Sequence, residues 1–171
     1  MDLKKVIRNI PDFPKKGIIF KDITPLLADP TAFKFAVDQM TDFARAQGAK
    51  AIVGIDSRGF IFGSVIAYKL GIKFVPVRKK GKLPYKAISE KYNLEYGTAE
   101  IEIHEDALAK GEKVLIVDDL LATGGTMKAT CNLVEKLGAE ICGIAFVINL
   151  TFLNGMEKIK NYKTLTLIDY E

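Results

Sequence analysis

Short apolar blocks alternate with longer amphipathic segments along this chain. Continuous apolar runs rich in branched side chains are typical of strands buried on both faces of a parallel sheet, and they occur here as AIVGI (51–55), IKFVPV (72–77), KVLIV (113–117) and EICGIAFVINL (140–150). Helical spacing is found at 30–47, 60–70 and 126–137, and each segment is followed directly by a glycine: Gly48, Gly71 and Gly138. The pattern predicts an α/β fold with a central, mostly parallel sheet flanked by helices, in a single domain over residues 1–171.

Residues 79–93 have neither a strand nor a helix period. A structureless segment of this length inside a compact domain is usually a lid or a binding element. It begins with a basic run, Arg78, Lys79, Lys80, Lys82 and Lys86, that no carboxylate interrupts before Glu90. We therefore predict a flexible loop over residues 79–93 that can close over a site and bring positive charge to it.

Composition narrows the class of protein. A chain of 171 residues with 49% hydrophobic residues can bury a core, and it has no apolar run near the roughly 18 residues of a membrane span. The N-terminus has lysines without an apolar stretch behind them, so we expect a cytoplasmic protein without a membrane partner. Cys131 and Cys142 match no metal or CxxC spacing, and we expect buried, reduced thiols. The net charge of +4 is too small to indicate nucleic acid but suits a phosphorylated substrate.

The stretch VLIVDDLLATGGT, residues 114–126, carries the clearest chemistry. An apolar strand leads to Asp118 and Asp119, a turn of small and hydroxylated residues follows, and a helix begins near Thr126. The crevice at the strand ends of an open α/β sheet is where ligands bind, and a helix N-terminus offers unpaired N–H groups to an anion. The sequence matches neither GxxxxGK[ST] nor GxGxxG. We predict a phosphate cradle over residues 122–126.

The two aspartates cannot be phosphate ligands, because they would repel the anion. Their carboxylates could accept hydrogen bonds from sugar hydroxyls or hold a divalent cation that a polyphosphate brings with it. A sugar phosphate with free vicinal hydroxyls satisfies both halves of the motif. The alternative is an ordinary strand-to-helix turn whose aspartates are solvated.

The same stretch is similar to the phosphoribosyl diphosphate (PRPP) binding motif of type I phosphoribosyltransferases. Other segments resemble the adenine-specific members of that family in order and spacing: GIIFKDITPLL (17–27), GIDSRGFIFG (54–63), VRKKGKLP (77–84) and LEYGTAEIEIH (94–104). The resemblance covers nearly the whole chain and departs from the family at Asn149, where a glutamate is expected. It implies the type I phosphoribosyltransferase fold, with a flexible catalytic loop and a small base-binding hood over about residues 1–28.

The resemblance also implies a reaction: adenine and PRPP give AMP and diphosphate with Mg²⁺, a step of purine salvage. The 5-phosphate of PRPP would lie on Ala122, Thr123, Gly124, Gly125 and Thr126, and the ribose and metal on Asp118 and Asp119. The diphosphate would contact Asp56, Ser57, Arg58, Gly59, Arg78 and Lys82. Family members usually hold the turn that carries Asp56 to Gly59 in a strained backbone, so we expect a non-proline cis peptide near Asp56 and Ser57.

Base recognition and catalysis follow from the resemblance alone. Adenine would be bound by Ile19, Phe20, Lys21 and Leu150, although without the family IIF would be interpreted as a core strand. Glu95 resembles the carboxylate proposed in this family as general acid/base at a purine nitrogen, and Tyr96 would cap the closed lid. Arg58, the second residue expected to take part in catalysis, would contact the diphosphate. Family members are usually homodimers.

Two other functions stay open at this point. A sister enzyme could use hypoxanthine, guanine or xanthine, although FPKKGIIFKDITPLL and Leu150 favour adenine. A regulator could keep the PRPP motif as a sensor without catalysis, but such proteins typically add a nucleic-acid-binding segment, and no helix-turn-helix extension is present.

Overall fold

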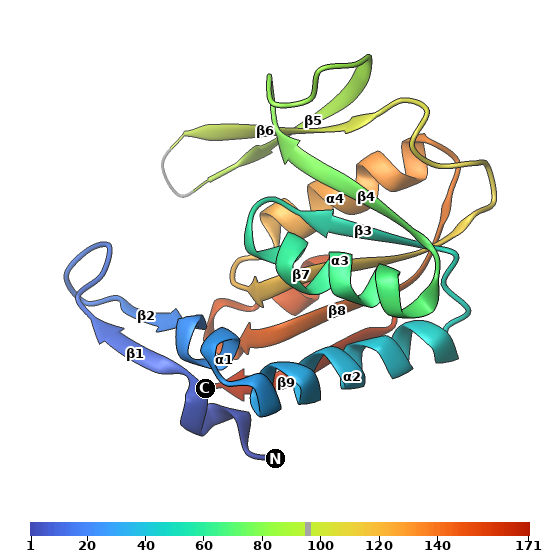
Figure 1. Cartoon of the computed structure of the whole chain (residues 1–171). Helices are drawn as coiled ribbons and strands as arrows, with labels where there is room; N and C mark the ends of the chain where they lie inside the picture. Colours follow the sequence, from blue (N-terminus) through green and yellow to red (C-terminus); the bar gives the residue numbers. More distant parts are fainter. Residues whose placement is uncertain (95–96) are drawn as a thin grey trace.

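A seven-stranded sheet forms the centre of the molecule (Figure 1). The structure is a computed structural model that describes residues 1–94 and 97–171. The strands lie in the spatial order β5-β6-β4-β3-β7-β8-β9. Their bounds are β3 Ala51–Ile55, β4 Lys73–Lys79, β5 Ala87–Asn93, β6 Thr98–His104, β7 Lys113–Leu121, β8 Glu140–Leu150 and β9 Thr164–Tyr170. Five neighbouring strands are parallel: β4, β3, β7, β8 and β9. β5 and β6 form an antiparallel hairpin that joins the sheet at β4.

Helices cover both faces of this sheet. α2 (Pro30–Ala46) and α3 (Arg58–Leu70) pack on one face, and α4 (Gly125–Lys136) packs on the other (Figure 1). The chain leaves β3 for its neighbour β4 and leaves β7 for β8, on the opposite side. Right-handed crossovers in opposite directions place α3 and α4 on opposite faces. The strand order therefore reverses between β3 and β7, and the carboxyl ends of these strands are where such a sheet binds ligands.

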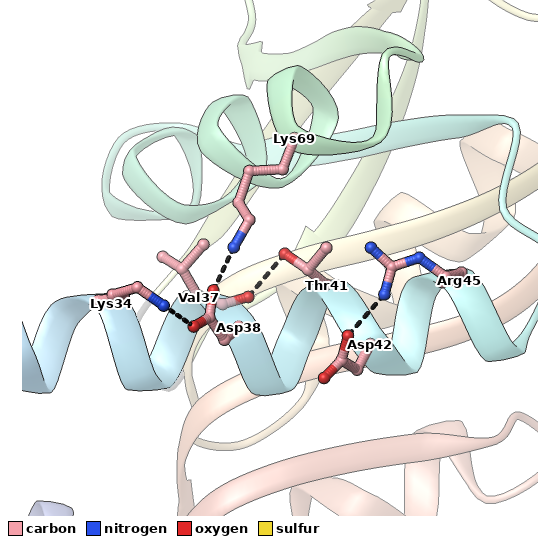
Figure 2. A network of polar contacts seen from close by, with 7 residues as sticks. All are labelled: Lys34, Val37, Asp38, Thr41, Asp42, Arg45 and Lys69. Carbon is pink, nitrogen blue, oxygen red and sulfur yellow. Dashed lines mark hydrogen bonds and ion pairs between the residues drawn. The ribbon is translucent and has the colours of Figure 1, made fainter.

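Local signals explain where α2 begins and what holds it. The Asp29 carboxylate accepts from the backbone N–H groups of Thr31 and Ala32, at 2.9 and 3.0 Å, and Pro30 occupies the first helical position. On the outer face Asp38 pairs with Lys34 of the same helix and with Lys69 of α3 (Figure 2). Exposed pairs of this kind contribute little stability, so the α2 and α3 layer depends mainly on its apolar contacts with the sheet.

The N-terminal residues form a hood with its own two-stranded sheet. It comprises the 3-10 helix η1 (Leu3–Val6), the antiparallel strands β1 (Arg8–Pro11) and β2 (Ile19–Asp22), and the short helix α1 (Thr24–Ala28). The Lys21 ammonium lies 3.9 Å from the ring centroid of Tyr170, the last residue of β9. A cation held over an aromatic face is attracted to it, so this contact ties the hood to the edge of the main sheet.

The structure confirms the α/β class, the four predicted strand blocks and the three predicted helices, with ends shifted by one or two residues at most positions. Gly48, Gly71 and Gly138 follow the helices with positive φ. The predicted loop over residues 79–93 was wrong in its second half, because 87–93 form β5 and pair with β6 along their whole length. Flexibility of the irregular residues 80–86 stays a prediction.

Two further expectations are refined. β7 does not end before the aspartates: it continues to Leu121 and pairs with β8 as far as Asn149, while its pairing with β3 stops at Val117. Cys131 is buried as expected, but Cys142 is only half-buried, and both are free thiols. Among the described residues no helix is both long and apolar enough to cross a membrane.

The departure at Asn149 has a structural setting. Its side chain is 6% exposed, and its amide nitrogen donates to the Asp169 carboxylate of β9 at 3.0 Å. A glutamate here would place a second carboxylate beside Asp169, whereas the amide provides a donor. The Asn149 side-chain oxygen, Oδ1, is buried and has no hydrogen-bond partner among the described residues.

Candidate active site

A crevice opens where β3 turns away from β7. Beyond Val117 the strand β7 loses its β3 neighbour, and Asp118 and Asp119 border the space that results. The cavity there has a volume of about 290 Å³, and its lining comes from three carboxyl strand ends, from the start of α4 and from the β5–β6 hairpin. The residues concerned are Ile55, Asp56, Ser57, Arg58, Val77, Arg78, Lys79, Tyr92, Ile101, Asp118, Asp119 and Thr126.

The predicted phosphate cradle forms a second, smaller hollow beside the first. Its volume is about 90 Å³, it is lined by every residue from Leu120 to Met127 together with Asp118 and Phe146, and it shares Asp118 and Thr126 with the larger cavity. α4 begins at Gly125, so the unpaired N–H groups of its first turn point toward this hollow. The structure thus places the five cradle residues of the sequence prediction around one anion-sized space.

Gly124 is required for the shape of this loop. Its φ of +79° lies in the left-handed region, and a Cβ there would approach the carbonyl oxygen of Gly155 to 2.6 Å. Gly155 begins the 3-10 helix η3 (Gly155–Ile159), and a Cβ on it would lie 2.3 Å from the Ala122 carbonyl oxygen. The loop and η3 therefore touch backbone to backbone. A side chain at Gly124 would therefore collide with Gly155.

The aspartates differ in their electrostatics. Asp119 is 4% exposed, and its carboxylate accepts from Nε of Arg58 at 2.5 Å. Burial raises the pKa of Asp118 well above its ordinary value, and the neighbouring Asp119 charge raises it further, while Arg58 lowers it less. The pKa of Asp118 is therefore raised in the ligand-free protein, whereas Asp119 has a cation beside it. Carboxyl groups with different environments can take different roles on one ligand.

Replacing Asp118 with asparagine is expected to raise the thermal unfolding midpoint of the ligand-free protein at pH 8 by roughly 2–4 °C. The amide removes a carboxyl that is costly to ionise, and its oxygen can still accept from the Asp119 N–H, as Asp118 does at 2.9 Å. Because the pKa of Asp118 is higher in the folded than in the unfolded protein, Asp118 does not destabilise the fold at a pH below its unfolded pKa. The destabilisation by its ionisation grows as pH rises toward the folded pKa, so the stability gained by Asp118→Asn should vanish near pH 3. Turnover should fall about tenfold or more with the lost carboxylate.

Thermal unfolding of both proteins from pH 3 to pH 8 measures this difference. A gain of equal size at every pH would contradict the electrostatic assignment.

The turn after β3 and the start of α3 carry four of the predicted diphosphate residues, Asp56, Ser57, Arg58 and Gly59. The Asp56–Ser57 peptide is cis, as expected, and α3 begins at Arg58. Gly59 has a packing role in addition, because a Cβ on it would lie 2.7 Å from the Val117 carbonyl oxygen. Nε of Arg78 donates to the Asp56 carboxylate at 2.9 Å and so holds the ends of β3 and β4 together.

Gly59 and Lys82 are the predicted diphosphate contacts that do not line this cavity. Lys82 lies in the turn after β4. Its carbonyl oxygen accepts from Arg78 at 3.4 Å, but its side chain does not line the crevice. Lys79, which the sequence prediction left out, lines it instead. The physical reason is the length of β4: the strand continues to Lys79 and holds that residue beside the crevice, whereas Lys82 lies beyond the strand in the turn.

The predicted base residues lie on the hood strand β2 and at the carboxyl end of β8. Ile19 and Lys21 are two apart on β2, so their backbone groups share one edge, and β1 is the one strand that pairs with β2 within residues 1–94 and 97–171. The Phe20 ring packs edge-on against Phe13, and the Arg58 guanidinium lies 5.6 Å from its centroid. Leu150 is half-buried beside Tyr170. Arg58 thus connects the aspartates with the predicted base side, and IIF is not a core strand because Ile19 is 56% exposed.

Glu95 and Tyr96 lie outside the described residues. The structure instead shows a tyrosine that sequence reasoning missed: the Tyr92 hydroxyl lies 3.1 Å from Thr126 Oγ1. The only sequence signal for it was the alternation of β5, which the prediction of a loop concealed.

Comparison with known proteins agrees with this geometry. A sequence profile described as phosphoribosyl transferase domain matches residues 27–168. The fold and the PRPP-type loop thus place the chain in the phosphoribosyltransferase class.

Closer relatives narrow the class. The chain is 56% identical to adenine phosphoribosyltransferase of Desulfosudis oleivorans over 171 residues, 100% of this chain and 99% of the relative. The structure of the Thermoanaerobacter pseudethanolicus enzyme matches with a TM-score of 0.95 at 50% identity, over 99% of this chain and 98% of that one. The Saccharomyces cerevisiae enzyme matches with a TM-score of 0.92 at 40% identity, over 98% and 97%. The chain belongs to the adenine phosphoribosyltransferase family.

Proposed function

We propose that this protein transfers the 5-phosphoribosyl group of PRPP to adenine, giving AMP and diphosphate in purine salvage. One observation carries the proposal: the anion-sized hollow of the 122–126 loop joins the larger crevice at Asp118 and Thr126. A ligand with a phosphate at one end and a charged group at the other can span both. The Saccharomyces cerevisiae enzyme was crystallised with an imino-altritol bisphosphate and adenine, which supports adenine as the base here.

The residues divide the work along the PRPP molecule. The 122–126 loop and the first turn of α4 would hold the 5-phosphate, and Asp118 and Asp119 would accept from the ribose hydroxyls. The diphosphate would lie at the turn of residues 56–59, with Arg58, Arg78 and Lys79 lining the same crevice. Lys82 could reach it only by movement of the turn after β4.

The reaction exchanges one bond at the anomeric carbon for another. Adenine N9 forms the new bond to C1 of the ribose as the adenine ring loses one proton, the C1–O bond breaks, and its electron pair leaves with the diphosphate. Positive charge near the departing oxygen stabilises the negative charge that develops on it. Arg78 is already oriented by Asp56, and Arg58 by Asp119. Such preorganised cations lower the barrier without rearranging during the reaction.

Mg²⁺ is a further part of the proposal. Among the described residues no three His, Cys, Asp or Glu side chains form a group that could hold a metal alone. Two neighbouring carboxylates fit an ion that arrives with its own oxygen ligands, as Mg²⁺ does on a diphosphate. Asp118 and Asp119 would hold it, and the ion would supply charge neutralisation for the leaving group.

Glu95 is proposed to move a proton at a purine nitrogen, with Tyr96 as a cap over the closed site. Replacing Glu95 with glutamine is expected to lower kcat by roughly ten- to a thousandfold, because general acid/base catalysis contributes effects of that order. Steady-state kinetics across pH measures the loss. A loss below tenfold with an unchanged pH profile would reduce Glu95 to a positioning role.

The function is tested by following AMP and diphosphate with PRPP, Mg²⁺ and a panel of adenine, hypoxanthine, guanine, xanthine and orotate. AMP formed only with adenine supports the proposal. Equal rates with hypoxanthine would favour a six-oxopurine enzyme, and PRPP binding without product from any base would favour a sensor. The homodimer stays a prediction from the resemblance, and the cytoplasmic location stays a prediction from the sequence composition.

A further inference from the structure

The strand β5 lies against α4 through side chains on one of its faces. Residues two apart on a strand point the same way, and here these are Glu90 and Tyr92. The Glu90 carboxylate accepts from the Asn132 amide at 3.0 Å and pairs with Lys136. The Tyr92 hydroxyl meets Thr126 at the start of the same helix. The hairpin is therefore attached along α4, and its last contact reaches the cradle itself.

Gly125 provides the space for this contact. A Cβ on Gly125 would lie 3.3 Å from Cδ2 of the Tyr92 ring. Unlike Gly124, Gly125 is absent from the glycines with positive φ, so the backbone shape alone does not require a glycine there. The lack of a side chain lets the ring lie against the first residue of α4. Tyr92 also lines the larger crevice, so it borders the ligand space as well as the helix.

The hydroxyl chemistry gives this contact a direction. Thr126 has one hydroxyl hydrogen, and an anion in the cradle would accept it. Once Thr126 donates to the anion, its oxygen can only accept from Tyr92. The Tyr92 hydroxyl would then donate to Thr126, and the two hydrogen bonds would polarise each other. A tyrosine has few rotatable bonds, so it can hold the threonine rotamer at little entropic cost.

We propose that Tyr92 is a positioning residue for the 5-phosphate, acting through Thr126, so that the β5–β6 hairpin contributes to recognition of the phosphomonoester end of the substrate. The proposal rests on the proposed function, because it assumes that the cradle binds a sugar phosphate. It predicts that loss of the Tyr92 hydroxyl weakens the binding of ligands with a phosphomonoester. Binding of the diphosphate leaving group, which would lie at residues 56–59, should stay unchanged.

The test is calorimetry of Tyr92→Phe with ribose 5-phosphate and, separately, with diphosphate and Mg²⁺. Loss of one hydrogen bond is expected to weaken ribose 5-phosphate about two- to tenfold and to leave diphosphate unchanged. In steady state the KM for PRPP should rise by a similar factor, with little change in kcat. Tyr162→Phe is the matched control: it removes a tyrosine hydroxyl that bonds Glu135 of the same helix at 2.6 Å, outside both cavities. It should leave both affinities unchanged.

A double-mutant cycle separates positioning from general damage to the hairpin. If Tyr92 acts through Thr126, the Tyr92→Phe effect on ribose 5-phosphate should disappear in a Thr126→Val background. Urea unfolding of each variant shows whether the fold is kept. Gly125→Ala, which crowds the Tyr92 ring, should reproduce the phosphomonoester defect by a second route.

The outcomes distinguish this inference from the proposed function. Two results would overturn the inference alone, provided that the wild type binds ribose 5-phosphate. Tyr92→Phe could bind ribose 5-phosphate as tightly as the wild type, or it could lose affinity for diphosphate to the same extent as for ribose 5-phosphate. Additive effects in the cycle would also overturn the inference alone. Wild-type protein that binds neither PRPP nor ribose 5-phosphate would overturn both. A selective Tyr92 defect in a protein that forms no AMP would overturn the function and keep the inference.

Discussion

Adenine is expected to be used about a hundredfold to ten-thousandfold more efficiently than hypoxanthine or guanine, measured as kcat/KM. Adenine presents an amino donor at C6 beside an unprotonated N1, whereas six-oxopurines present an oxygen acceptor beside an N1–H donor. The backbone edge shared by Ile19 and Lys21 can match one of these patterns. With the other pattern a donor faces a donor at one position and an acceptor faces an acceptor at the other, and each buried unpaired group costs about 1–3 kcal/mol.

The Lys21 side chain offers a control for this selectivity. It donates to Asn9 at 2.7 Å and lies over the Tyr170 ring, so it holds the hood and does not point to the base by itself. Lys21→Arg keeps a cation for that ring and should retain the preference for adenine. Initial rates with the base panel measure both proteins. Comparable kcat/KM for adenine and hypoxanthine in the wild type would refute the backbone-edge explanation.

Replacing Gly124 with valine is expected to weaken PRPP binding by about a hundredfold or more and also to destabilise the fold. The residue has φ of +79°, which a β-branched side chain adopts only with strain. The new Cβ would lie 2.6 Å from the Gly155 carbonyl oxygen, so the loop and η3 must separate. We expect a stability loss on the order of 1–3 kcal/mol from this strain, together with the loss of the anion cradle.

Gly125→Ala is the matched comparison for this prediction. Its Cβ would approach the edge of the Tyr92 ring to 3.3 Å and the Asn93 carbonyl oxygen to 3.6 Å, and its backbone has no positive φ. It should lower PRPP affinity a few-fold and leave the unfolding midpoint near that of the wild type. Calorimetry with PRPP and urea unfolding give the two quantities for each variant. Unchanged PRPP affinity in Gly124→Val would exclude residues 122–126 as the phosphate site.

Much of the fold was predictable because its strongest signals are local. The four apolar blocks are the strands buried on both sides, where continuous hydrophobicity leaves little ambiguity. The glycines after the three helices mark left-handed ends that only the local backbone determines. The strands that prediction missed lie in the hood, in the antiparallel hairpin or at the far edge of the sheet: β1, β2, β5, β6 and β9. Their side chains are partly exposed, so the apolar pattern is weak there.

The candidate site divides in the same way. The strand, aspartates and TGGT turn are contiguous, so residues 114–126 alone determined the cradle and the type of ligand that it suits. Only the tertiary structure decided which distant groups meet it. The contact of Gly155 with Gly124, the pair of Arg58 with Asp119, and Tyr92 on Thr126 join residues 31, 61 and 34 positions apart. Such pairings depend on strand order and crossover direction, which leave no mark on the local sequence.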